Sequence, residues 1–301
     1  MSITEKLDLA IKLQERKTTS GGYVTTYENE RFFRQTYMMN AEWETFVEYM
    51  KNNEFQPYAY TEYVKGGGGE LFEKGGCPPK MASFGSSSRM LYTLSCGIKG
   101  FHYEKKLQTT IGGEANLDGF YEGENRYVFV EAKCHEPYNV KKTVISSKYK
   151  DLYKDINEKM AENVCVVMPE SKCGRYLNVD YYIEGKKLER FDLKQMICHL
   201  LGIASDLLKG TLEKRKIDFI YLLYDPTELD IESKTKIKID QIYRKTCDEC
   251  NLINFAELFR VVLEFLNHTE FNNVMSDKEI NDIISNFKFT LASQKNYLCL
   301  I

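Results

Sequence analysis

The sequence has no long apolar run, no excess of positive charge and no regular pairing of cysteines. None of its apolar stretches reaches the roughly 20 residues that a helix needs to cross a bilayer. Its first residues are polar and charged, unlike a secretory signal, so we expect a cytoplasmic protein without a membrane partner. The nine cysteines include a single Cys-x-x-Cys motif, Cys247 to Cys250, and the sequence has no second pair of ligands spaced for zinc. Reduced thiols are therefore expected.

Several common active-site signatures are also missing. The four histidines include no His-x-x-x-His, which argues against a zinc hydrolase. Gly66 to Gly69 form a glycine run, but no Gly-Lys-Ser/Thr follows it, so we interpret it as a loop and not as a phosphate cradle. The net charge of −3 means that any affinity for nucleic acid must come from local basic patches.

What is present is an ordinary globular composition, with 43% hydrophobic and 28% charged residues in a chain of 301. Residues 1–80 are predicted to be a mostly helical N-terminal extension that contains the glycine-rich loop. Residues 81–301 are predicted to form an α/β domain. Within it we expect a core at about 85–225, an insert at 135–191 and a helical C-terminal part.

The core pattern predicts a mixed central sheet flanked by helices. A helix over 86–96 precedes three short strands joined by tight turns, at 101–109, 116–121 and 126–134. A strongly periodic helix at 192–209 then leads to a near-continuous apolar strand at 217–224, a pattern typical of parallel pairing. The insert is predicted to hold a helix within 147–163 and one strand at 164–167. Capping-box spacings at Asn254 and Ser276 predict two further helices.

Three residues of the second and third predicted strands point to phosphodiester chemistry. Asp118 lies on one strand, and Glu131 and Lys133 end the next, one tight turn later. Residues two apart in a strand share a face, so Glu131 and Lys133 point together. Two carboxylates suit a hard divalent cation, and a lysine beside them offsets transition-state charge. A surface ion pair at a strand end is the alternative interpretation.

The segments Asn116-Leu117-Asp118 and Glu131-Ala132-Lys133-Cys134-His135-Glu136-Pro137 resemble the PD-(D/E)xK nuclease superfamily, in particular its branch of mostly uncharacterised restriction-endonuclease-like proteins. The resemblance covers residues 85–225 and implies a restriction-endonuclease-like αβββαβ core with helical N- and C-terminal additions. It further implies Mg²⁺ as cofactor, with Mn²⁺ as a substitute, and Asp118, Glu131 and Lys133 as catalytic residues. Leu117 departs from the nominal proline, but leucine is a tolerated variant there.

Two more positions follow from this resemblance. Glu104 would be an accessory metal ligand beside Asp118 and Glu131, or simply a solvated strand residue. Gln195 would contact water or phosphate as a fourth catalytic residue, or complete a capping box with Asp192. Glu114 is expected in a loop beside the Gly112-Gly113 turn, and His199 is expected to make a satisfied contact at the edge of the core.

The leading hypothesis is therefore a Mg²⁺-dependent deoxyribonuclease, an endonuclease of restriction or another defence system. Its partner would be DNA, and a homodimer is compatible with this hypothesis. One alternative is a catalytically silent nuclease-like module that binds nucleic acid or a protein. Another is an unrelated α/β protein with a chance match, in which Asp118 and Glu131 would lie far apart.

Overall fold

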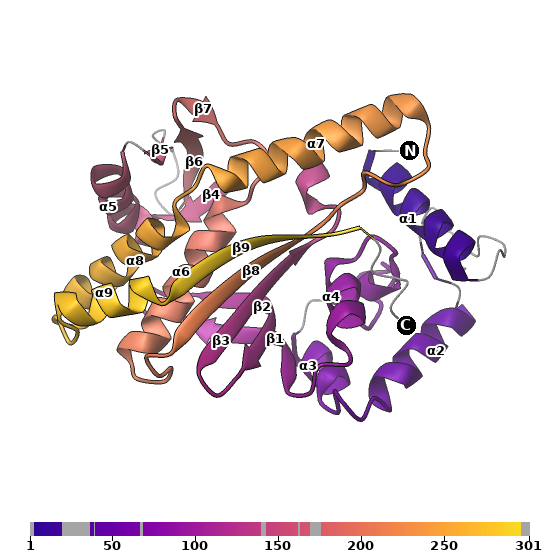
Figure 1. Ribbon diagram of the computed structural model, residues 1–301, viewed down its shortest axis with the longest axis horizontal. Coiled ribbons are helices and arrows are strands. Elements are labelled where there is room, and N and C mark those ends of the chain that lie inside the picture. The colour runs from indigo at the N-terminus through magenta and orange to yellow at the C-terminus, as the bar shows by residue number, and fades with distance from the viewer. Residues whose placement is uncertain are drawn as a thin grey trace.

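The computed structural model describes residues 3–19, 37–38, 40–66, 69–139, 143–161, 163–168 and 176–295. Its centre is a mixed five-stranded sheet in the order β1-β2-β3-β8-β9, which confirms the predicted α/β class (Figure 1). The strands are β1 (Phe101–Gln108), β2 (Glu114–Glu122), β3 (Arg126–Lys133), β8 (Lys216–Tyr224) and β9 (Phe287–Gln294).

The predicted antiparallel meander and the parallel strand after it are confirmed. β1 pairs with β2 and β2 with β3 in antiparallel fashion, and β3 pairs with β8 in parallel, with Glu131 opposite Tyr221. Glu114 is the first residue of β2 and pairs with Gln108, so the expected loop at this position is wrong. β9 was not predicted; it adds a fifth strand, parallel to β8, to a C-terminal part that was expected to be helical.

Helices cover both faces of the sheet. They are α1 (Ile3–Thr19), α2 (Asn40–Lys51), α3 (Ala59–Gly66), α4 (Ser87–Ser95), α5 (Lys150–Met160), α6 (Leu193–Leu208), α7 (Ser233–Asn251), α8 (Phe255–Thr269) and α9 (Asp277–Ser285), with 3-10 turns η2 (Lys80–Ala82), η3 (Glu136–Tyr138) and η4 (Ser147–Tyr149). None of the helices in the described ranges combines the length and the apolarity needed to cross a membrane.

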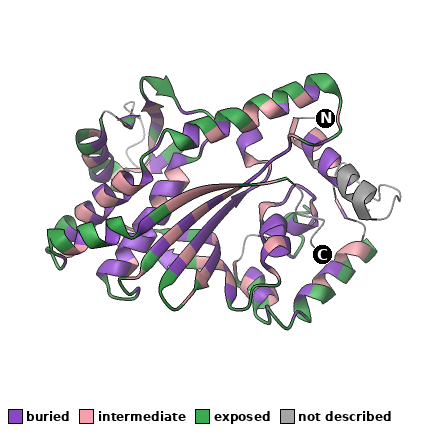
Figure 2. Ribbon diagram, in the orientation of Figure 1, coloured by how far each residue is buried: buried purple, intermediate pink, exposed green. Residues whose placement is uncertain are grey.

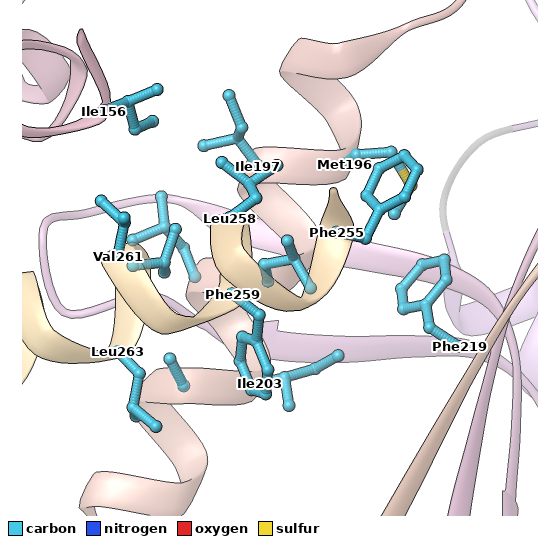
Figure 3. Close-up of a cluster of buried hydrophobic side chains, with 14 of the residues drawn as sticks. Ile156, Met196, Ile197, Ile203, Phe219, Phe255, Leu258, Phe259, Val261 and Leu263 are labelled. Atoms are coloured by element: carbon cyan, nitrogen blue, oxygen red, sulfur yellow. The ribbon is translucent and has the colours of Figure 1, made fainter. Parts of the chain in front are cut away.

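Two clusters of buried hydrophobic side chains lie on either side of the sheet. The first and larger cluster joins one face of the sheet to α5, α6, α8 and α9. α6 is apolar at three- and four-residue steps, and its side chains Met196, Ile197 and Ile203 interlock with those of α8 (Figure 3). Burying such apolar side chains stabilises the fold by roughly 1.5–3 kcal/mol each. Gly202 lets α6 approach the sheet closely, since an added Cβ would lie 2.8 Å from the Cβ of Leu107.

The opposite face packs against α1 to α4 and α7 to form the second cluster. Leu7 of α1 and Met50 of α2 are fully buried in it together with Ala132 of β3 and Ile239 of α7. The exposed sides of these helices face outward (Figure 2). Residues 3–66, where described, therefore share one hydrophobic core with the sheet.

The insert is richer in strands than the sequence indicated. α5 and β5 (Cys165–Val167) are where a helix and a strand were predicted. In addition, β6 (Tyr176–Ile183) pairs with β4 (Thr143–Ser146) on one side and β5 on the other, and β7 (Lys186–Lys187) completes a hairpin with β6. Residues 140–142, 162 and 169–175 of the insert lie outside the described residues.

Candidate active site

The site lies at the level of the sheet where the apolar side chains of β1 and β2 switch from one face of the sheet to the other. Phe101 and Tyr103 of β1 pack in the second cluster, but Leu107, on the same alternation, packs in the first. Between them Glu104 has a φ of 52°, a left-handed conformation that costs a bulky side chain about 1 kcal/mol or more. The pairs Tyr103–Gly119 and Lys105–Leu117 flank this position, so Glu104 and Asp118 lie opposite each other.

β2 changes face at the same level. Leu117 belongs to the first cluster, whereas a Cβ on Gly119 would touch Phe101 and Leu91 of the second. Asp118 lies between them at the step. The change of face occurs in both strands at the same level, and this explains how the side chains of Glu104 and Asp118 come to lie close together.

Glu131 and Lys133 lie on the neighbouring strand and point the same way, as predicted. The Lys133 Nζ atom donates to Glu131 Oε1 at 2.5 Å. The Asp118 Oδ2 atom accepts from the backbone N–H of Ala132, between these two residues, at 2.7 Å. The exposed fraction is 0% for Glu131 and 8% for Lys133, so the ion pair lies below the surface. The structure thus brings Asp118, Glu131 and Lys133 together.

A second partner holds Glu131 from behind. The His199 Nε2 atom of α6 lies 2.9 Å from Glu131 Oε2, and both side chains are almost fully buried. The sequence led us to expect only a core contact for His199. The missed signal is its spacing, because Gln195 and His199 are four residues apart and therefore share one face of α6.

Glu136 is a further residue to which sequence reasoning gave no role. Its Oε1 atom accepts from Ser87 Oγ at 2.8 Å, and its Oε2 atom accepts from the Cys134 N–H at 2.8 Å. Burial alone would raise the pKa of Glu136, but Lys133 and His135 outweigh it and hold the pKa below its ordinary value. Glu136 thus joins the end of β3 to α4 and adds negative charge next to Lys133.

Burial and mutual repulsion divide the acidic groups into two kinds. Burial, then the nearby Glu131 charge, raise the pKa of Asp118 well above its ordinary value. Burial and Glu70 raise the pKa of Glu104 to about 7. Glu131 behaves oppositely, since Lys133 and His199 outweigh its desolvation and lower its pKa. Lys133 is desolvated too, but Glu131, Glu136 and Asp118 raise its pKa well above normal, so it stays protonated at neutral pH.

Asp118, Glu104 and Lys133 of the sheet border a cavity of about 620 Å³, here called the site cavity, and Glu131 lies behind them. Gln195 lines the cavity from the start of α6. The Asp192 side chain caps α6 by accepting from the Gln195 N–H at 3.0 Å. Gln195 therefore contributes its backbone N–H to the cap and borders the cavity, but among the described residues its side chain makes no bond to the Asp192 N–H, so the predicted capping box is not formed.

The site has oxygen donors of the kind that a hard cation prefers, although the described residues hold no ready-made ion site. Within the described residues no three His, Cys, Asp or Glu side chains converge as ligands of one ion. Mg²⁺, however, usually takes one or two carboxylates and keeps several waters. Asp118 and Glu104 are two such carboxyls at the cavity, and burial first and then neighbouring carboxylates raise the pKa of both, effects that a bound cation would oppose.

The Cys-x-x-Cys pair lies away from this chemistry, whereas His135 also lines the site cavity. Cys247 and Cys250 are free thiols in the last turn of α7. The ring Nδ1 of His135 contacts the carbonyl oxygen of Gly85. The ring Nδ1 of His102 lies 2.7 Å from Glu62 Oε1 on α3.

Comparisons with protein-family models, with curated proteins and with solved structures gave no match. The geometry of the chain itself therefore carries the functional argument.

Proposed function

We propose that this protein is a metal-dependent nuclease that hydrolyses phosphodiester bonds in DNA, with the restriction-endonuclease-like core that its sequence resembles. The order α4, β1, β2, β3, α6, β8 supports this, since it follows the αβββαβ arrangement with the insert between β3 and α6. The observation that carries the proposal is the group at the floor of the site cavity. There a buried, protonated Lys133 is bonded to Glu131 beside Asp118.

Each residue has a role that its environment supports. Asp118 and Glu104, with Glu131 beside them, would hold Mg²⁺ or Mn²⁺, which would polarise the phosphoryl group and lower the pKa of the attacking water. Lys133 presents a fixed positive charge toward the cavity and stabilises the charge that develops on the phosphate. His199 orients Glu131. Gln195, which borders the cavity, would contact the water or a phosphate oxygen.

A catalytically silent module is the second candidate, and one observation favours it. Glu131 is fully buried, and both of its oxygens lie against cationic or ring nitrogen partners, Lys133 and His199. A carboxylate held in this way is what a purely structural ion pair would show. The two candidates make opposite predictions for cleavage.

The decisive experiment incubates the purified full chain with supercoiled plasmid, linear duplex and single-stranded DNA in Mg²⁺, in Mn²⁺ and in EDTA. We expect cleavage that requires the metal and is lost in Asp118→Asn, because this change removes charge while it conserves shape. Asp151→Asn, at an exposed position on α5, is the matched control and should cleave normally. Metal-dependent cleavage that survives in Asp118→Asn would place the active site elsewhere, and no cleavage of any substrate would favour the silent module.

A further inference from the structure

Two cavities meet at Lys133. The second cavity, of about 300 Å³, shares Lys133, Glu136 and Gln195 with the site cavity as lining residues. The site cavity extends toward α1, α3 and α4, whereas the second cavity extends toward η3, the insert strands and the start of α6. The proposed reactive lysine therefore lies at the junction of a two-part groove.

The two parts differ in charge. Acidic side chains outnumber basic ones in the site cavity, where Glu5, Glu70, Glu104, Asp118 and Glu136 are set against Lys80 and Lys133. The second cavity is balanced, with Glu136, Glu189 and Asp192 set against Lys133, Arg190 and Lys194. A cation is thus favoured on one side of Lys133, and an anion is tolerated on the other.

The charged groups of the second cavity differ in whether they already have partners. Each of its three carboxylates is already bonded: Glu136 to Ser87, Glu189 to Lys245 and Asp192 to the Gln195 N–H. The side chain of Lys194, by contrast, forms no hydrogen bond or ion pair with the described part of the chain, and the residue is half-buried at the cavity. Its ammonium group is therefore available to an incoming anion such as a phosphate.

The depth of the reacting groups limits what reaches them. Glu131 is fully buried and Lys133 is 8% exposed. Duplex DNA is a stiff rod, with a persistence length of about 50 nm, and does not fold into a recess of this size. An unpaired strand is flexible enough to enter such a recess, and proteins that bind single strands do so in grooves that follow the phosphate backbone.

We infer that the substrate is an unpaired strand of DNA that crosses Lys133 from one cavity to the other, with the phosphate next to the scissile one held by Lys194. This inference rests on the proposed nuclease function. It specifies the form of the substrate and one contact in the second cavity.

The first test compares two substrates without ends, a single-stranded DNA circle and a relaxed, covalently closed duplex circle, in Mg²⁺ or Mn²⁺. We expect the single-stranded circle to be cut at least tenfold faster. Equal rates on both circles would overturn the inference and leave the nuclease function intact. If neither circle nor any linear DNA is cut, the nuclease function itself fails.

The second test measures Lys194→Ala against Lys209→Ala, which removes an exposed lysine at the other end of α6. We expect Lys194→Ala to raise KM for single-stranded DNA about tenfold, the value of one charge-assisted hydrogen bond, with kcat changed less than twofold. Binding of a fluorescent oligothymidylate in Ca²⁺ should also lose about 0.7 from its log–log salt slope. Lys209→Ala should leave both quantities unchanged. Wild-type KM and salt slope in Lys194→Ala would overturn the assigned contact.

Discussion

At the scale of single residues, the Lys133–Glu131 pair combines a proposed catalytic role with a structural one. Both groups are buried, and each stabilises the charged form of the other. Removing one partner of a buried ion pair leaves the other charge without compensation, which costs about 3–5 kcal/mol. The pair therefore limits which substitutions give an interpretable loss of activity.

We predict that Lys133→Ala abolishes cleavage and also lowers the free energy of unfolding by about 3 kcal/mol or more. His199 alone would then face the Glu131 carboxylate. The double variant Lys133→Ala/Glu131→Gln should recover most of the stability, because it removes the orphaned charge, but none of the activity. Urea unfolding of the three proteins checks this. Wild-type stability in Lys133→Ala would show that the pair contributes little to folding.

Glu104 predicts a pH dependence of stability. Its pKa is about 7 in the folded protein against an ordinary 4.5, so the folded state resists its ionisation. The wild type should lose about 2–3 kcal/mol as the pH rises from 4.5 to 7, with the full loss above 7. Glu104→Gln should lack this loss and gain stability relative to the wild type across the same window.

Unfolding at a series of pH values in EDTA measures this difference. Glu114→Gln, at an exposed position where β2 begins, is the control and should follow the wild type. Parallel stability profiles of Glu104→Gln and the wild type would contradict the raised pKa. With Mn²⁺ present, a cation held by Glu104 and Asp118 should increase stability more at pH 8 than at pH 5.

At the scale of elements, α6 positions the site through its close approach to the sheet. A Cβ on Gly202 would lie 2.8 Å from Leu107 Cβ and 3.0 Å from Ala115 Cβ. We predict that Gly202→Ala destabilises the protein by about 1–2 kcal/mol, because overpacking outweighs the better helix propensity of alanine. Displacement of α6 should also lower kcat, since His199 moves with the helix.

Gly97→Ala is the matched control, since an added Cβ there meets no atom within 4 Å. We expect its stability to stay within about 0.5 kcal/mol of the wild type, as measured by thermal unfolding. If Gly202→Ala is equally neutral, the approach of α6 to β1 and β2 is looser than described.

The sequence predicted the elements whose pattern is local and missed those that depend on distant partners. α6 and β8 carry strong apolar periodicity and were placed almost to the residue. β9 was missed, although Phe287, Phe289 and Leu291 alternate with Lys288 and Thr290, because the capping signals before it favoured helices. β4, β6 and β7 are short or weakly alternating, so only their mutual pairing defines them.

The same division holds for the candidate site. Asp118, Glu131 and Lys133 lie on adjacent strands joined by a tight turn, so their proximity follows from local geometry. The contact of His199 with Glu131 arises only when α6 packs on the sheet. The left-handed φ of Glu104 has no signal in the residue type, because glutamate does not favour that conformation.

At the scale of the whole molecule, the two hydrophobic clusters share the sheet between them. The second cluster joins α1 and α2 to β3 and α7, so the N-terminal helices have no core of their own within the described residues. Trp43 of α2 is the single tryptophan in the sequence, and its ring stacks on Phe46 with centroids 5.7 Å apart. Its fluorescence therefore reports on the N-terminal helices alone.

We predict that the transitions monitored by Trp43 fluorescence and by far-UV circular dichroism coincide in urea, as expected for one cooperative unit. Leu7→Ala, at a fully buried position of α1, should shift both midpoints together and cost about 2–5 kcal/mol. A fluorescence transition that precedes the dichroism transition would mark residues 1–80 as an independently unfolding extension.

The change of face at Glu104 and Asp118 bears on the order of folding. An isolated hairpin closes in roughly 1–10 μs. The β1–β2 hairpin, however, buries apolar side chains in both clusters, Tyr103 in the second and Leu107 in the first, so it is stable only when helices are in place on both sides of the sheet. We expect late completion of this pairing, with φ-values below about 0.3 for truncations of Tyr103 and Leu107 in stopped-flow kinetics. The acidic pair of Glu104 and Asp118 would then assemble last, so the divalent cation that we propose for it would bind only to the completed fold.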